Sequence, residues 1–337
     1  MPALRTVAEI EVVALADLDP NRLQSAGDRF GISHRYRDAA ALLADPAVDA
    51  VAVCVPVRHH VEVARAVLEA RKHLFLEKPL ALSLAESDRL IDAAAGSSLT
   101  IQMGFNLRWH RLVREARARL EEGTLGRIVA VRSTLTSDVR FHRDVPDWRK
   151  RRCDGGGEFF ETAIHHFDLW RFLFDTTIEE IFAHSCSNDW DDETTVVSAR
   201  LANGALASAM FSITTAGSSE LEIYGEKGRL SLSFFRFDGL ELTETTTPVG
   251  DVCSRLRKLA QTVTMLPWAT LRARSGGDFL DSYRLEWRNF ADCARQSAPA
   301  SCTLDDGQHA LRAVLAAVAS VDLRRPVPID RVRDMGN

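Results

Sequence analysis

The chain has 337 residues, of which 46% are hydrophobic and 26% charged, and this composition is typical of a folded protein large enough for two domains. Its formal net charge of −5 argues against nucleic acid as a partner, because nucleic-acid binders usually carry a clustered basic excess. No apolar run is long enough to span a membrane, and the N-terminus lacks the layout of a signal peptide. The six cysteines are scattered, which favours a reducing, cytoplasmic environment.

The first third of the chain alternates between strand-like and helix-like patterns. Short, nearly continuous apolar runs predict buried strands at residues 9–17, 49–56, 72–79 and 98–105. Helical patterns lie between them, at 21–31, 37–48, 59–72 and 83–96. This alternation predicts a parallel α/β sheet of the Rossmann type, and we place a dinucleotide-binding domain at residues 1–106.

Asp17 ends the first predicted strand. A dinucleotide-binding fold places a carboxylate there, where it bonds the adenosine ribose and repels the extra phosphate of NADP. Alternatively, Asp17 and Asp19 only cap the helix that follows Pro20. Sixteen residues precede Asp17, too few for a strand and a G-x-G-x-x-G loop about 20 residues upstream. We therefore expect an N-terminally truncated Rossmann domain, through a start site assigned too far downstream, a shortened chain, or a true loss of the loop.

The segment LEKP places Glu77 and Lys78 at the carboxyl end of a predicted strand. Open α/β sheets bind ligands at this end, so the lysine could bond a substrate hydroxyl or carbonyl oxygen. The proline that follows restricts the lysine backbone to extended conformations. The alternative is an ordinary solvated lysine at a strand end.

The rest of the chain has a different pattern, and we assign residues 107–337 to an α+β domain with a large, open, mainly antiparallel sheet. After a helix at 111–126, strands are predicted at 128–137, 194–203, 205–214, 219–226 and 228–235. Helices at 157–174, 278–296 and 305–322 would cover one face. Residues 248–277 are predicted to be less regular, as a surface insertion or subunit-contact arm, with a basic, anion-recognising lid as the alternative.

The segment GGGEFFETAIHHFDLWRFLF, residues 155–174, carries the strongest chemical signal. Its glycines permit an unusual backbone and close approach to a ligand, and they lead into the predicted helix. On that helix Glu161, His165 and Asp168 share one face, where a carboxylate can orient an imidazole as a general base. A purely stabilising Glu161–His165 pair is the alternative. Glu161, His165 and Asp168 could alternatively hold a divalent metal, but the second imidazole, His166, points roughly 100° away, so we predict no metal.

Taken together, several motifs resemble those of the Gfo/Idh/MocA (glucose-fructose oxidoreductase / inositol dehydrogenase) family. They are VVALADLDPNR, VDAVAVCVPVRHH, LFLEKPLA, the WR at 148–149 and GGGEFFETAIHHFD, in the family's order along nearly the whole chain. The first residues, MPALRTV, resemble the family's first helix after its glycine-rich loop. The resemblance implies a dinucleotide-binding domain followed by an α+β domain used for substrate and subunit contacts.

The resemblance also implies roles for individual residues. Lys78 corresponds to a lysine that contacts substrate and nicotinamide, and His165 to the histidine that takes the hydroxyl proton. Glu161 stands where the family usually has aspartate, and completes the predicted catalytic set. The predicted cofactor-binding residues are Asp17, Leu18, Val55, Pro56, His60, Glu77 and Lys78. The predicted substrate contacts are Arg108, Trp109, Arg149 and His166.

The predicted function is hydride transfer between a nicotinamide cofactor and a carbon of a sugar, cyclitol or related polyol. NAD is expected rather than NADP, because of Asp17. The alternative is a non-catalytic ligand-binding or assembly protein of the same family that has lost dinucleotide binding. We expect a small-molecule substrate, no nucleic acid or membrane partner, and a homodimer or homotetramer formed through the C-terminal sheet.

Overall fold

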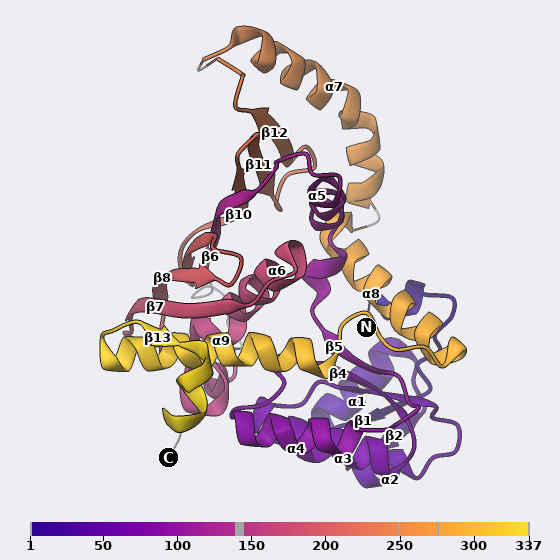
Figure 1. Cartoon of the computed structure of the whole chain (residues 1–337). Coiled ribbons are helices and arrows are strands. Elements are labelled where there is room, and N and C mark those ends of the chain that lie inside the picture. The colour runs from indigo at the N-terminus through magenta and orange to yellow at the C-terminus, as the bar shows by residue number, and fades with distance from the viewer. Residues whose placement is uncertain (1, 139–144, 249, 275, 336–337) are drawn as a thin grey trace. The chain divides into compact units, whose positions relative to one another are not determined.

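The computed structural model describes residues 2–138, 145–248, 250–274 and 276–335. Contacts between residues divide the chain into two compact units, and Figure 1 labels the helices and strands that belong to them. Unit 1 contains residues 1–106 and 283–311, and unit 2 contains residues 107–282 and 312–337. The helices α8 (Gly277–Gln296) and α9 (Leu304–Leu323) each contribute residues to both.

Unit 1 contains the predicted parallel strands. They are β1 (Ala14–Ala16), β2 (His34–Tyr36), β3 (Ala50–Val53), β4 (His73–Glu77) and β5 (Ile101–Gly104). One parallel sheet has the order β1-β2 and a second has the order β3-β4-β5. The prediction of parallel strands is confirmed, but the strand expected at 9–17 covers only three residues, and the short strand β2 was missed.

Four helices alternate with these strands, as predicted: α1 (Pro20–Phe30), α2 (Ala39–Leu43), α3 (His60–Glu69) and α4 (Leu84–Ala94). Asp19 caps α1 by accepting hydrogen bonds from the N–H groups of Asn21 and Arg22. Side chains cap the start of α4, because the N-cap Ser83 accepts from the Glu86 N–H and Glu86 accepts from the N–H of Leu82, one residue before the N-cap.

Residues 283–311, which we assigned to the second domain, belong to unit 1 in the structure. The reason is aromatic packing on the central strand β4. Trp287 of α8 stacks on Phe75 with ring centroids 3.9 Å apart, and Phe290 meets both rings edge-on. Val7 completes this buried cluster. Nothing in the local periodicity of α8 indicates which sheet it covers.

Unit 2 is built on an eight-stranded sheet with the order β12-β11-β10-β6-β9-β8-β7-β13. Every neighbouring pair is antiparallel except β6 and β9, which confirms the mainly antiparallel sheet. Its strands are β6 (Ile128–Asp138), β7 (Ile178–Cys186), β8 (Thr194–Leu201), β9 (Leu206–Ser212), β10 (Thr214–Gly225), β11 (Gly228–Ser233), β12 (Leu240–Glu244) and β13 (Val327–Pro328). Strands β7, β12 and β13 were not predicted.

The main helices of unit 2 are α5 (Arg111–Glu121), α6 (Ile164–Phe174) and α7 (Val252–Arg274), besides the shares of α8 and α9. A π-helical turn, Phe159–Ala163, leads directly into α6. Trp170 of α6 donates a hydrogen bond to Ser133 of β6 (2.9 Å), which fixes the helix on one face of the sheet. The prediction of irregular structure at 248–277 was wrong for the 23 residues of α7.

Candidate active site

Asp17 and Leu18 follow β1 at its carboxyl end. The Asp17 N–H donates to the carbonyl of Tyr36 in the neighbouring strand, and its carboxylate accepts from the Asp19 N–H (2.8 Å). Both Asp17 and Leu18 are exposed, Leu18 to 82%. The capping role expected as the alternative falls to Asp19, and the exposed carboxylate of Asp17 stays accessible to a ribose hydroxyl.

Val55, Pro56 and His60 come together beyond the end of β3. The His60 ring is buried, with Nδ1 2.7 Å from the carbonyl oxygen of Pro79 and Nε2 2.9 Å from that of Val55. Burial lowers the pKa of His60. Because both ring nitrogens face main-chain oxygens, His60 ties the segment after β3 to the segment after β4. We therefore infer that it positions cofactor-binding groups rather than touching the cofactor itself.

Glu77 and Lys78 stand at the carboxyl end of β4, where Glu77 is paired with Gly104 of β5. Both side chains are half-buried, and the Lys78–Pro79 peptide bond is cis. A neighbour that sequence analysis missed is Tyr283 of α8. Burial, assisted by the charge of Glu77, raises the pKa of Tyr283 to about 12. No local pattern links two residues about 200 positions apart.

The three glycines before α6 are required by the protein's own packing. Gly155 and Gly157 have positive φ angles of 85° and 77°. A Cβ atom on Gly156 would lie 2.2 Å from the carbonyl oxygen of Arg149. The loop therefore packs against the backbone of the 147–150 turn, and close approach to a ligand is not needed to explain these glycines.

That packing brings Arg149 onto Glu161. The guanidinium donates two hydrogen bonds to the Glu161 carboxylate, at 3.0 and 2.7 Å, and Glu161 is the more buried partner. This bond raises the pKa of Arg149. A carboxylate whose charge is balanced by an arginine raises the basicity of a neighbouring imidazole less than a lone carboxylate does. Arg149 thus moderates the predicted effect of Glu161 on His165.

His165 and His166 occupy different environments at the start of α6. His165 is half-buried, whereas His166 is fully buried with its ring 5.2 Å from that of Phe211. Burial lowers the pKa of His166 to about 4, so its imidazole is neutral at physiological pH. Neither ring nitrogen of His166 has a hydrogen-bond partner among the described residues. A core position fits His166 better than the predicted substrate contact.

Arg108 and Asp168 form a buried ion pair. Arg108 is 6% exposed and Asp168 1% exposed, and two hydrogen bonds of 2.8 and 2.5 Å join them. The guanidinium also lies over the ring of Phe172. We therefore infer a structural role for Arg108, which was predicted to contact substrate. The indole N–H of the neighbouring Trp109 is buried and finds no acceptor in the part of the chain that the structure describes.

Two models of known families match this sequence. Residues 1–105 match the family described as an oxidoreductase family with an NAD-binding Rossmann fold, and residues 113–231 match the GFO/IDH/MocA C-terminal domain. The chain belongs to the GFO/IDH/MocA oxidoreductase family. The prediction from the motifs is thus confirmed, and with it the class of enzyme and the NAD-binding Rossmann fold.

Individual relatives support this family assignment. Myo-inositol 2-dehydrogenase of Thermotoga maritima is 30% identical over 98% of this chain and 94% of its own. Levoglucosan dehydrogenase of Pseudarthrobacter phenanthrenivorans is 29% identical over 68% of this chain and 66% of its own. Among solved structures, a probable dehydrogenase from Thermotoga maritima superposes with a TM-score of 0.78 at 26% identity, covering 98% of this chain and 95% of that one.

The residues of unit 1 fit part of a dinucleotide of the kind that GFO/IDH/MocA enzymes use. Asp17, Glu77 and Lys78 stand at the carboxyl ends of parallel strands, where α/β folds bind nucleotides. The sequence has no G-x-G-x-x-G, so the pyrophosphate has no assigned partner. Among the described residues, no group of side chains could hold a metal ion and no helix could cross a membrane.

Proposed function

We propose that this protein is an NAD(H)-dependent dehydrogenase or reductase that acts on a secondary alcohol of a sugar, cyclitol or related polyol. The similarity to myo-inositol 2-dehydrogenase, which extends over 98% of this chain, is the observation that carries the proposal. The relative named levoglucosan dehydrogenase widens the substrate class to sugars. The reaction removes or returns a hydride at the alcohol carbon together with the hydroxyl proton.

NAD is the proposed cofactor, in preference to NADP. The support comes from Asp17, whose carboxylate is exposed at the carboxyl end of β1. A carboxylate there accepts hydrogen bonds from the ribose hydroxyls and repels a 2′-phosphate. Leu18, Val55, Pro56, Glu77 and Lys78 are the further proposed cofactor contacts.

In the proposed mechanism the bound nicotinamide would supply the hydride acceptor. His165 takes the proton from a substrate hydroxyl group, and Lys78 binds a substrate oxygen and stabilises its developing negative charge. Glu161 orients His165 and is itself fixed by Arg149. Trp109, whose indole N–H lacks an acceptor among the described residues, is a proposed substrate contact.

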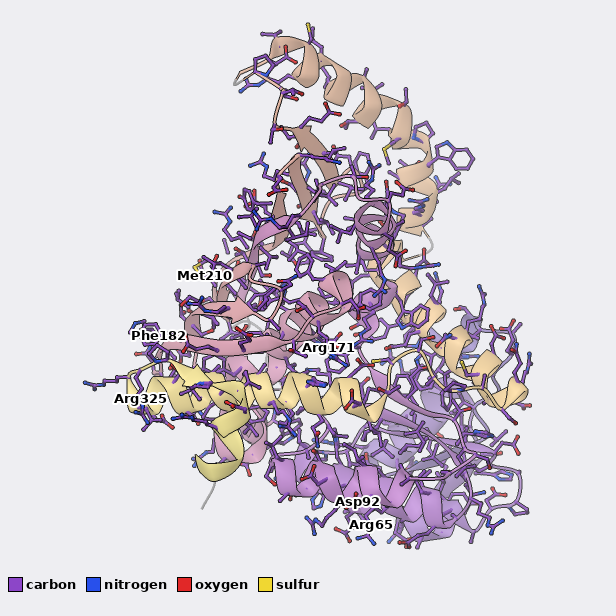
Figure 2. All side chains as sticks on the ribbon, viewed as in Figure 1. Arg65, Asp92, Arg171, Phe182, Met210 and Arg325 are labelled. Carbon is purple, nitrogen blue, oxygen red and sulfur yellow. The ribbon has the colours of Figure 1, made fainter. Side chains whose placement is uncertain are left out.

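The family role of the C-terminal sheet supports a homodimer or homotetramer. Four exposed apolar side chains lie on neighbouring strands β6, β9 and β8: Val129, Leu206, Met210 and Val196. Val196 and Met210 stand opposite each other in the ladder, and Figure 2 labels Met210 on the sheet.

The six cysteines form no disulfide in the structure, which agrees with the cytoplasmic location that we propose.

The decisive experiment compares the wild-type protein with His165→Ala. The variant should retain NADH binding, measured by fluorescence titration, and lose turnover of myo-inositol and related polyols by about 100-fold or more. NADPH, titrated in parallel, should bind more weakly than NADH. Equal turnover by the two proteins would contradict the role of His165. A wild-type protein that binds neither dinucleotide would instead support a non-catalytic ligand-binding or assembly protein.

A further inference from the structure

Helix α7 carries an unusual number of exposed apolar side chains. Of the large apolar residues that are exposed in the described part of the chain, seven lie on this helix: Val252, Leu256, Leu259, Val263, Leu266, Trp268 and Leu271, each between 45% and 69% exposed. Clustered exposed apolar side chains of this kind mark interaction surfaces. None of the family features described above uses α7.

Five of these residues follow a strict pattern. Val252, Leu256, Leu259, Val263 and Leu266 are separated by four, three, four and three positions, and the next step of four reaches Thr270. We call these six residues the α7 seam. Alternating steps of three and four are the a and d positions of a heptad repeat, which is the pattern of a helix that pairs with another helix.

The α7 seam is not the side of the helix that packs on its own unit. Thr262 donates a hydrogen bond to Asp238 (2.8 Å), and among the α7 residues whose burial the structure describes, Thr262, Met265 and Ala269 are partly buried. At about 100° per residue, these three lie roughly 60–120° around the helix from Leu259. The seam is therefore an apolar stripe without a partner in the described part of unit 2.

We infer that α7 pairs in antiparallel orientation with α7 of a second copy of this chain. A two-fold axis near residue 261 places every seam residue opposite another one. Leu259 then meets the partner's Val263, Leu256 meets the partner's Leu266, and Val252 meets the partner's Thr270. Such an interface is isologous, which means that one surface supplies both halves.

The residues that flank the seam fit this occupant. The central flanking positions are uncharged: Ala260 and Pro267 stand on one side of the seam, and Thr262 and Ala269, which are partly buried against their own unit, stand on the other. Arg255 faces the partner's Ala269 in the antiparallel register, so no two like charges oppose each other there. Antiparallel pairing also sets the helix dipoles in opposite directions, which favours it over parallel pairing.

A lipid surface fits less well, although residues 252–274 contain five basic and no acidic residues. Helices that lie on membranes bury a broad apolar face. The α7 seam is a narrow stripe, and Trp268, 69% exposed, stands roughly 180° away from Leu259. A flat surface that covers the seam would leave this tryptophan in water, whereas a second helix needs only the stripe.

The test is the mass of the full chain by sedimentation velocity. The inference is that the α7 contact joins copies that the sheet does not join, so the variant Leu259→Glu/Val263→Glu should have half the wild-type mass. The matched control is Leu271→Glu, equally exposed but outside the seam, and it should keep the wild-type mass. These substitutions are on the surface, so the circular dichroism spectrum and thermal transition should not change.

Cross-linking provides a second measurement. With Cys253 changed to serine, Ala260→Cys should form a disulfide-linked dimer on mild oxidation, because residue 260 lies beside its own counterpart at the proposed axis. Leu271→Cys should not. The inference is overturned if the double variant keeps the wild-type mass, or if Leu271→Glu halves the mass too. It is also overturned if the wild-type protein binds phosphatidylserine vesicles and the seam substitutions abolish that binding without changing the mass.

Discussion

The buried pair of Arg108 and Asp168 gives the sharpest prediction. Asp168→Asn keeps the shape of the side chain but removes the charge that pairs with a guanidinium only 6% exposed. Removing one partner of a buried pair costs about 3–5 kcal/mol. The ring of Phe172, which lies 5.1 Å from the guanidinium carbon, still offers a cation–π contact. We therefore expect a loss near the lower limit, about 3 kcal/mol.

This loss should appear in unit 2. A cooperative unit of about 200 residues loses about 2–4 °C in its melting temperature per kcal/mol, so the transition should fall by about 6–12 °C. Differential scanning calorimetry measures the shift, and urea unfolding followed through the buried Trp170 measures the free energy. Replacing both partners, as in Arg108→Met/Asp168→Leu, should restore most of the stability, because both charges of the pair are then replaced by apolar groups.

The kinetic comparison then separates a structural role from substrate binding. Well below its transition, Asp168→Asn should have the wild-type KM for the polyol substrate. A loss of stability under about 1 kcal/mol together with a large rise in KM would refute the structural role of Arg108 and restore the predicted substrate contact.

Two further predictions concern buried histidines. The pKa of His166 is about 4 in the folded state and about 6.5 when unfolded, so below pH 6.5 the unfolded chain binds the proton first. The free energy of unfolding should fall by up to about 3 kcal/mol between pH 6.5 and 4. Urea titrations should show a smaller fall for His166→Phe. An identical pH profile in the variant and the wild type would contradict this assignment. His60→Leu should destabilise unit 1 by about 2 kcal/mol and weaken NADH binding, because it removes the single N–H that the neutral ring donates to the carbonyl of Val55 or Pro79. His59→Leu is the control, and NADH affinity equal to wild type in His60→Leu would exclude a positioning role.

The sequence predicts the elements of this fold best where local chemistry determines them. Ser83 and Glu86 cap the helix predicted at 83–96, and the apolar runs around β4 and β5 are buried strands. The helix α7 was missed because Pro267 and the interleaved basic residues obscured its period. The residues of the α7 seam recur at steps of three and four positions, but they are exposed and do not pack into the core of their own unit.

Partners distant in sequence could not be predicted in the same way. No periodicity connects Arg108 with Asp168, 60 positions later, or assigns Trp287 to the face of Phe75. The 147–150 turn approaches the glycine loop because Gly156 has no Cβ atom, and this approach joins Arg149 to Glu161. These pairings depend on how whole elements pack, which is determined by contacts summed over each unit.

The structure also separates the roles of three residues that the helix pattern treats as one group. Asp168 is buried with Arg108, and Glu161 is bound by Arg149, so both carboxylates already have cationic partners. His165 is the half-buried imidazole on the same stretch, and it differs from the fully buried, neutral His166 beside it. A proton acceptor must exchange its proton with substrate and solvent, which a half-buried imidazole can do and a fully buried one cannot. The burial of the two rings therefore supports the proposal of His165 as the base, which the sequence analysis had made from the shared helix face and the family motif.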